Sequence, residues 1–254
     1  MLCDMGVYMN INKDAYGWEV WDYQNKKDGF EIIHRGDNTY WISSGPKTYF
    51  SKYKDWPDNL KKALKQVKGK VLDIGCGAGR TCLYLQKKDY KVVGIDNSPL
   101  AVKTCKARGV KNVKIMGIEE IDKLKEKFDT ILMLGNNFGL FGSYEKAKKI
   151  LKKMYNQTND GALIIAESID PYKTKDPLNL EYQKSNVKQG RMAGQLKLQI
   201  VYKKYIGHWF DYLIVSKKEM KDILKGTGWK AKAFVNPKKS TKCYVAIIEK
   251  ENKK

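Results

Sequence analysis

From residue 70 onward, short uninterrupted apolar runs alternate along the chain with segments of helical periodicity. Strands that are apolar throughout, rich in β-branched residues and separated by helices are typical of a parallel sheet covered on both faces. A helical stripe of apolar residues from Tyr144 to Met154 separates the last two runs. We therefore predict an α/β fold whose first five strands occupy 70–74, 91–95, 112–116, 128–134 and 162–168.

The chain closes with a helix at 217–226 and two further apolar runs at 230–235 and 243–249, which the turn N-P-K-K-S joins. Two strands that are joined by a short turn must run antiparallel. The pattern therefore predicts that the last strand runs against its neighbours in an otherwise parallel sheet.

Two segments fall outside this alternation. Residues 1–56 are rich in aromatic side chains and show little clean periodicity. Residues 169–216 are too long for an ordinary connection, and their second half alternates in the manner of an antiparallel hairpin. We therefore expect an aromatic-rich accessory segment at 1–56 and a main domain at 57–254, which contains a β-rich insertion at 169–216.

Composition limits the class of protein. No apolar run approaches the roughly 20 residues of a membrane helix, and the first ten residues lack the basic and then apolar pattern of a signal peptide. The five cysteines are scattered without a C-x-x-C pair, and there are two histidines. We expect free thiols, no metal site, no membrane partner and a cytoplasmic location.

The formal net charge of +21 is a feature that nucleic-acid-binding proteins share. Only four of the 49 basic residues are arginines, whose planar guanidinium is the preferred reader of phosphates and bases. The lysines recur in patterns such as Y-E-K-A-K-K-I-L-K-K-M, which is typical of a solvated helix face. The charge therefore favours a lysine-rich surface over a dedicated nucleic-acid-binding face.

The stretch V-L-D-I-G-C-G-A-G-R, residues 71–80, leads from the first strand into a loop with glycine at alternate positions. Such a loop brings the backbone close to a nucleotide-like ligand, and Asp96, about 20 residues on, can accept both ribose hydroxyls. Asp73 would oppose a pyrophosphate at the following helix N-terminus. It suits a cationic, phosphate-free ligand such as S-adenosylmethionine (SAM).

Residues 70–170 resemble the class I SAM-dependent methyltransferases. V-L-D-I-G-C-G-A-G-R matches the first motif of that family, V-V-G-I-D-N-S-P the second, and F-D-T-I-L-M-L-G-N-N-F-G-L the strand-four motif. The resemblance implies a Rossmann-like, seven-stranded, mostly parallel sheet with an antiparallel last strand. It also implies that SAM is the cofactor and S-adenosylhomocysteine (SAH) the product.

The resemblance implies roles for particular residues. The methionine end of SAM would lie at Asp73, Gly75, Gly77 and Gly79, and the ribose at Asp96. Asn97 would border the adenine, while Gly135 and Asn136 would sit near the reacting methyl group. The family usually carries an acidic residue where this chain has Ile118. The adenine would therefore contact either the main chain at Ile118 or the side chain of Glu119. Glu119 is equally well explained as a solvated helix residue without a binding role.

Methyl transfer from a sulfonium is an in-line displacement, so the enzyme must align the reactants and exclude water, and a general base is optional. We expect the acceptor above the carboxyl ends of strands four and five. The catalytic candidates are Asn137, Glu167 and His208, although a lone histidine beside tryptophan is more often a packed residue. The substrate-binding candidates are Asp170, Tyr172, Arg191 and Trp209.

We therefore expect a SAM-dependent methyltransferase for a small-molecule acceptor, with residues 1–56 and 169–216 forming a lid over the substrate. An RNA methyltransferase is the alternative that the charge suggests, although G-N-N-F differs from the N-P-P-Y type of many base-amino methylating enzymes. A protein methyltransferase and a non-catalytic SAM-binding protein are further alternatives. The sequence identifies neither the methyl acceptor nor the oligomeric state.

Overall fold

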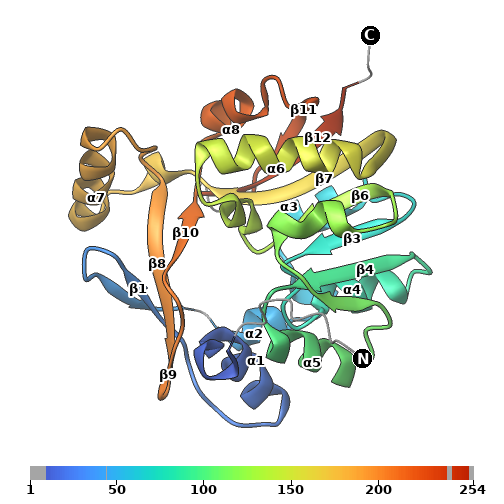
Figure 1. Ribbon diagram of the computed structural model, residues 1–254, viewed down its shortest axis with the longest axis horizontal. Coiled ribbons are helices and arrows are strands. Elements are labelled where there is room, and N and C mark those ends of the chain that lie inside the picture. The colour runs from blue at the N-terminus through green and yellow to red at the C-terminus, as the bar shows by residue number, and fades with distance from the viewer. Residues whose placement is uncertain (1–9, 44, 239–241, 252–254) are drawn as a thin grey trace, which may run out of the picture.

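The computed structural model describes residues 10–43, 45–238 and 242–251. Its centre is a seven-stranded sheet in the order β11-β12-β7-β6-β3-β4-β5 (Figure 1). The strands are β3 (Val71–Ile74), β4 (Val92–Asp96), β5 (Val113–Ile115), β6 (Phe128–Met133), β7 (Thr158–Ile169), β11 (Trp229–Val235) and β12 (Cys243–Lys250). Strand β12 is antiparallel to both of its neighbours, and the pairs from β7 to β5 are parallel. The predicted α/β architecture is confirmed.

Helices cover both faces of this sheet (Figure 1). One apolar core packs α3 (Asp58–Leu64), α4 (Arg80–Gln86) and α5 (Pro99–Ala107) against it. The other core packs η3 (Ile118–Lys123), η4 (Asn137–Phe141), α6 (Tyr144–Asn156) and α8 (Lys217–Leu224). The buried face of α6 carries the stripe that the sequence predicted, and burial of each such aliphatic side chain stabilises the fold by roughly 1.5–3 kcal/mol.

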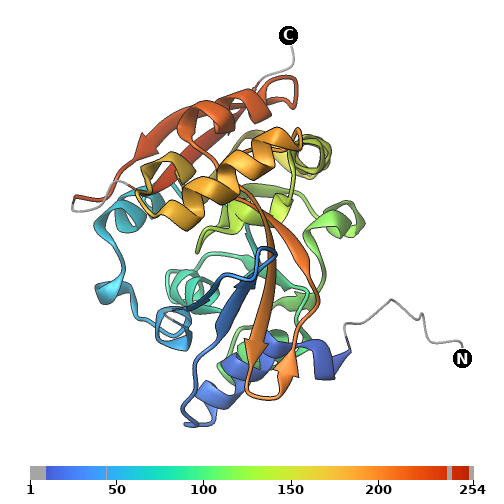
Figure 2. The same ribbon diagram turned by 90° about the vertical axis from the view of Figure 1, so that its left-hand side faces the viewer.

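A second sheet joins the two segments that fall outside the α/β alternation. It contains β1 (Ile32–Arg35), β2 (Tyr40–Ile42), β8 (Gln195–Tyr202), β9 (Tyr205–Ile206) and β10 (Phe210–Leu213). Strand β8 pairs antiparallel with β9 and β10, so the hairpin expected in residues 195–216 is confirmed. Strand β1 also pairs with β8, with Ile32 opposite Val201, and Figure 2 shows these strands side by side. The sequence did not predict this pairing.

The remaining helices lie in the chain segments before α3 and after β7. They are η1 (Ile11–Lys13), α1 (Ala15–Gln24), α2 (Pro46–Tyr49), η2 (Tyr53–Asp55), η5 (Pro171–Lys173) and α7 (Pro177–Lys188). The buried residues of α1 include Glu19 and Asp22, which is why no apolar helical stripe marks this helix in the sequence. We refer to residues 10–43, 45–56 and 195–213 together as the accessory layer.

Two further observations bear on the sequence predictions. Cys76, Cys82, Cys105 and Cys243 are free thiols, whereas Cys3 and the start of the N-terminal segment lie outside the described residues. Within the described ranges, none of the helices combines the length and the apolarity that crossing a membrane would require.

Candidate functional site

The glycine loop lies at the carboxyl end of β3. Gly75, Gly77 and Gly79 all have positive φ angles, of +65°, +55° and +75°, a conformation that strains any residue with a Cβ. The amides of Gly75 and Cys76 donate to the carbonyl oxygen of Ile95 on β4, at 2.9 and 3.1 Å. The loop is therefore fixed to the neighbouring strand before α4 begins at Arg80.

Asp96 ends β4 and points into this loop. It is buried, and its Oδ2 accepts a hydrogen bond from the Gly77 amide at 2.9 Å, while its Oδ1 accepts from the Ser98 amide at 2.9 Å. A carboxylate offers about four acceptor positions, so both oxygens retain capacity for ribose hydroxyls. Burial raises the pKa of Asp96 to about 6, although the Ser98 and Gly77 amides oppose the shift. These hydrogen bonds are thus compatible with the ribose-binding role, which stays a prediction.

Asp73 lies on β3 beside Asp96 and is equally buried. Its partner among the described residues is the Cys82 thiol, a weak donor, at 3.3 Å from Oδ2. Burial raises the pKa of Asp73 to about 7, the Cys82 thiol and Arg80 oppose this rise, and the charge of Asp96 adds to it. A carboxylate that is buried with so weak a partner would be stabilised by a cationic ligand.

The end of β6 closes the loop from the other side. Asn137 donates from Nδ2 to the carbonyl oxygens of Ile74 and Gly75, at 2.9 Å in each case. Asn136 adopts a left-handed backbone conformation, and the Gly135 amide donates to Glu167 on β7. Burial raises the pKa of Glu167. The structure therefore gathers Gly135, Asn136, Asn137 and Glu167 at the same edge as Asp73.

The residues expected near the adenine follow the ends of β4 and β5. The Met116 amide donates to the carbonyl oxygen of Asp96 at 2.9 Å, which places the following residues beside the end of β4. Ile118 is buried at the start of η3, whereas Asn97 and Glu119 are exposed. The adenine assignment for these three residues stays a prediction.

The substrate-binding and catalytic candidates from the insertion make contacts away from the glycine loop. Tyr172 is exposed and donates to Glu219 at 2.8 Å, and Asp170 accepts from the Tyr172 amide. Arg191 is exposed and donates to Gln189. His208 and Trp209 are exposed between β9 and β10, where the Trp209 ring lies 4.7 Å from the ring of His34. The hydrogen bonds and ring contacts described for these residues do not reach the glycine loop.

The N-terminal segment contributes residues that sequence reasoning missed. Tyr16 of α1 lies over the glycine loop. Its hydroxyl is so close to Gly77 that a Cβ built on this residue would clash with it. Tyr16 also packs edge-on against Tyr49, with ring centroids 5.3 Å apart. Asp14 at the start of α1 accepts from the Ser98 hydroxyl at 2.8 Å and from the Leu100 amide at 3.1 Å. The abundance of aromatic residues was the only signal for this contact in the sequence.

The insertion reaches the same edge through β10. Tyr212 donates to the carbonyl oxygen of Asn136 at 2.6 Å, and its ring packs closely on Gly139. The two ends of the accessory layer therefore meet the carboxyl edge of the central sheet from different sides. In Figure 1 this layer stands beside the ends of β3 and β6.

The chemistry of this edge fits SAM. Asp73, Asp96 and Glu167 are carboxyl groups with raised pKa values, and Arg80 is the cation that acts on Asp73 and Glu167. An ammonium and a sulfonium would relieve the cost of burying these acids, whereas a pyrophosphate would add to it. The residues present would thus hold the amino acid end and the ribose of SAM.

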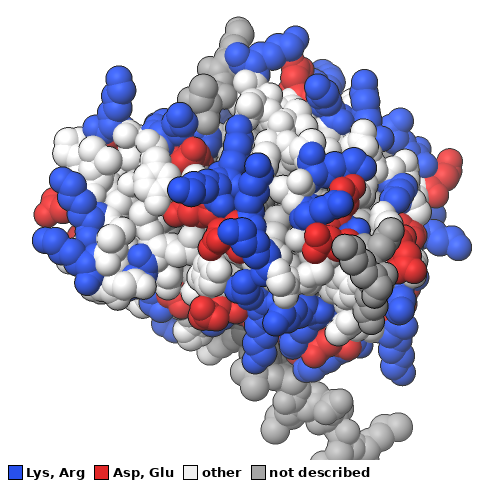
Figure 3. All heavy atoms as spheres, turned by 90° about the horizontal axis from the view of Figure 1, so that it is seen from above, with Lys and Arg blue, Asp and Glu red and all other residues white. Residues whose placement is uncertain are grey.

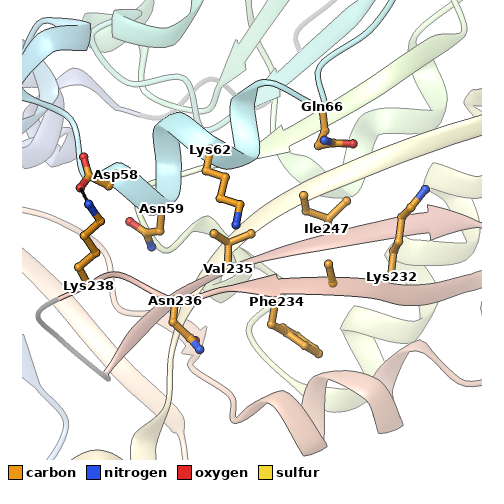
Figure 4. Close-up of a pocket in the computed structure, with 11 residues that line it drawn as sticks. Asp58, Asn59, Lys62, Gln66, Lys232, Phe234, Val235, Asn236, Lys238 and Ile247 are labelled. Atoms are coloured by element: carbon orange, nitrogen blue, oxygen red, sulfur yellow. Dashed lines mark ion pairs between the residues drawn. The ribbon is translucent and has the colours of Figure 1, made fainter.

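A cavity of about 520 Å³ lies elsewhere, between α3 and the strands β11 and β12 (Figure 4). Its lining mixes the side chains of Asn59, Lys62 and Lys232 with the apolar side chains of Phe234 and Val235. Strands β11 and β3 are separated in the sheet by β12, β7 and β6, so this cavity is distinct from the glycine loop.

Comparison with known proteins agrees with this geometry. Residues 65–228 match the family model described as a methyltransferase domain, which is more than half of the chain. The chain therefore belongs to the methyltransferase domain family, and its sheet order and glycine loop are those of the class I SAM-dependent methyltransferases. The resemblance inferred from the sequence motifs is confirmed.

Particular relatives are similar over different lengths. A SAM-dependent methyltransferase of Bacteroides fragilis, crystallised with SAH, is 25% identical with a TM-score of 0.82, over 96% of this chain and 98% of that one. The 2-heptyl-1-hydroxyquinolin-4(1H)-one methyltransferase of Mycobacteroides abscessus is 32% identical over 116 residues, 43% of this chain and 50% of the relative. An uncharacterized methyltransferase of Schizosaccharomyces pombe is 36% identical over 70 residues, 26% of this chain and 48% of its own length. The chain thus spans about half the length of the curated relatives that it matches.

Proposed function

We propose that this protein transfers the methyl group of SAM to a small-molecule acceptor. The observation that carries the proposal is the meeting of two buried carboxyl groups, Asp73 and Asp96, with a glycine loop that Tyr16 covers. SAM supplies a methyl group on a positively charged sulfur, which needs no further activation. The remaining task of the protein is to bind, align and dehydrate the reactants.

Each part of the site has a role in this proposal. Asp73 would hold the ammonium group of SAM, and Asp96 would accept hydrogen bonds from its ribose hydroxyls. Asn137 fixes the carbonyl groups of Ile74 and Gly75 and so holds the glycine loop in shape. Tyr16 and Tyr212 cover the loop and the end of β6, and they would exclude water from the reacting atoms.

The accessory layer supports a small acceptor over a macromolecular one. Its side chains that contact Gly77 and Asn136 would obstruct a long polymer at this edge. The relative from Mycobacteroides abscessus is named for a small heterocyclic substrate, which agrees with an acceptor of that size.

The surface charge gives little support to the RNA alternative. On the face in Figure 3, lysine and arginine side chains are spread widely, with acidic side chains among them. Three of the four arginines make contacts inside the fold. Arg35 binds Asn179 and Asp37, Arg80 donates to the Thr48 carbonyl oxygen, and Arg108 lies over the Phe50 ring. These guanidinium groups are therefore engaged within the protein.

The test is SAH formation from SAM with cell-extract fractions as acceptors. One fraction contains metabolites that pass a small-pore filter, and a parallel fraction contains the retained RNA and protein. We expect SAH to form with the filtrate and to persist after ribonuclease treatment. SAH formation only with the retained RNA would replace this proposal by the RNA alternative.

A further inference from the structure

Glu19 and Glu31 are buried in the accessory layer without a full set of partners. Both residues are 1% exposed. Within the described part of the chain, Oε1 and Oε2 of Glu19 and Oε2 of Glu31 have no well-aligned hydrogen bond from a third residue, and the amide and carboxyl group of Glu31 are the polar groups that act on Glu19. A buried carboxyl group without a full set of partners destabilises the folded state. Three such oxygens at one place therefore form a candidate site for a ligand that would complete their environment.

Hydroxyl groups and the backbone approach the carboxyl groups of Glu19 and Glu31 closely. Glu31 Oε1 accepts hydrogen bonds from the Tyr49 hydroxyl at 3.1 Å and from the Ser43 hydroxyl. A Cβ on Gly45, which has a φ of +54°, would lie 2.8 Å from Glu19 Oε1, so the backbone approaches this oxygen closely. No lysine or arginine of the described ranges forms an ion pair with Glu19 or Glu31.

The two carboxyl groups act on each other. Burial, followed by the nearby charge of Glu31, raises the pKa of Glu19 well above the usual range of a carboxyl group. Two adjacent carboxyl groups that cannot both ionise share one proton between them. A ligand with one positive charge would therefore balance the pair.

The pair lies next to the site of methyl transfer. Tyr49, which donates to Glu31, packs against Tyr16, and Tyr16 covers Gly77. The pKa of Tyr16 is raised by burial and then by Tyr49, Asp96, Glu31 and Glu19, so the cofactor-binding carboxylate and the pair act on one phenol. A group held by Glu19 and Glu31 would thus lie close to the methyl donor at Asp96.

We propose that Glu19 and Glu31 bind the amino group of the methyl acceptor, so that the acceptor is a primary or secondary amine. This rests on the proposed methyltransferase function and names its substrate class. The faces of Tyr16 and Tyr49 would add cation–π attraction to an ammonium ion.

The pair would also remove the proton that makes the amine unreactive. The ammonium group gives one proton to the singly charged pair, which becomes neutral. The freed nitrogen then gives its lone pair to the methyl carbon while the carbon–sulfur bond breaks and its electrons stay on sulfur. A methylated ammonium and SAH result, and the extra proton leaves the pair to water in the next cycle. Charge and atoms balance in this sequence.

The test uses the full-length protein, methyl-labelled SAM and two matched libraries. One contains aliphatic and aromatic amines, and the other contains alcohols with the same carbon skeletons. We expect methylated products from the amine library, identified by mass spectrometry, and none from the alcohols. If the filtered extract supports SAH formation but no amine is methylated, the amine assignment is overturned and the methyltransferase function stands. If no fraction supports SAH formation, the proposed function fails, and the amine assignment fails with it.

Variants then test the pair itself. Glu19→Gln and Glu31→Gln should each lower kcat/KM for the best amine at least tenfold and leave SAM affinity within about twofold. Glu181→Gln, an exposed site on α7, is the matched control and should be without effect. Tyr49→Phe removes one hydrogen bond to Glu31 and should give a smaller loss, which keeps the test valid if the Gln variants unfold. Full amine activity in both Gln variants would overturn the proposal.

Discussion

Asp73 and Asp96 lie on neighbouring strands, near the end of β3 and at the end of β4, and both carboxyl groups are buried with raised pKa values. Without a cationic ligand, each ionised group destabilises the folded chain, because burial removes its hydration and a nearby carboxylate repels it, Asp96 in the case of Asp73 and Asp14 in the case of Asp96. The sulfonium and ammonium groups of SAM can therefore stabilise the site by offsetting this unfavourable electrostatic energy. This is the residue-scale reason for expecting SAM there.

The pH dependence of binding follows from the pKa of Asp73, which is about 7. Because SAM binds the ionised carboxylate, its affinity should fall about tenfold between about pH 8 and about pH 6 in calorimetry. The free protein should show the opposite trend. A raised carboxyl pKa gives stability below the unfolded pKa near 4, and this stability is lost as the pH rises through about 7. Asp73→Asn should remove most of both trends, and unchanged trends in that variant would contradict the assignment.

The ribose assignment rests on Asp96. Asp96→Ala should weaken SAM binding by at least tenfold in calorimetry, because the acceptors for the ribose hydroxyls and for the Gly77 amide are lost together. Asp160→Ala, which alters an exposed carboxylate, is the control and should bind SAM as the wild type does. Unchanged affinity in the Asp96 variant would remove the ribose role.

At the scale of elements, α1 and the glycine loop depend on each other. Asp14 joins the start of α1 to the start of α5, and Tyr16 occupies the space that a side chain at residue 77 would need. We therefore propose that the N-terminal segment forms part of the cofactor site.

Gly77→Ala should weaken SAM binding more than tenfold and lower the free energy of unfolding. Its φ of +55° strains alanine by roughly 1–2 kcal/mol, and the added Cβ meets the Tyr16 hydroxyl. Tyr16→Phe removes that hydroxyl, so the double variant should recover part of the stability but retain the backbone strain. Strictly additive losses in this double-mutant cycle would show that the two residues do not touch.

Arg35 joins β1 to the insertion. It donates to Asn179 at 2.5 Å and to Asp37 at 2.7 Å, and it lies 4.4 Å from the Tyr182 ring centroid. Arg35→Ala should weaken this contact between β1 and α7 by roughly 2–3 kcal/mol, because the buried guanidinium group and its hydrogen bonds to Asn179 and to the partly exposed Asp37 are lost. Hydrogen exchange should accelerate in β1 and α7 and stay unchanged in the central sheet. The exposed Arg191→Ala is the control, and equal acceleration there would rule out a specific role for Arg35.

The central sheet could be predicted because its strands are apolar throughout and its helices have caps that the sequence reveals. Ser98 accepts from the Ala101 amide as the N-cap of α5, and Pro99 stands in the first turn, where its missing N–H costs nothing. The carboxyl ends of parallel strands then bring Asp73, Asp96 and Glu167 to one edge.

The accessory layer could not be predicted in the same way. Strand β1 has four residues, and its partner β8 lies more than 150 residues along the chain, so no local pattern encodes their pairing. Helix α1 buries Glu19 and Asp22, which conceals its periodicity. The acids that we propose to bind the acceptor therefore could not be recognised before the fold was known.

At the scale of the whole molecule, the accessory layer faces the carboxyl edge of the central sheet (Figures 1 and 2). The N-terminal segment contributes Tyr16, Glu19 and Glu31, and the insertion contributes Tyr212. The N-terminal segment and an insertion within the methyltransferase domain thus meet at this edge, an arrangement that suits the proposed small acceptor between the cofactor and the accessory layer.

A crystal structure of the full-length protein with SAH tests this arrangement most directly. The ribose hydroxyls should lie within about 3 Å of Asp96, with the amino group toward Asp73 and the sulfur facing Tyr16 and the Glu19–Glu31 pair. SAH bound in the cavity between α3 and β11, or at the glycine loop with its sulfur turned to open solvent, would contradict the proposed site.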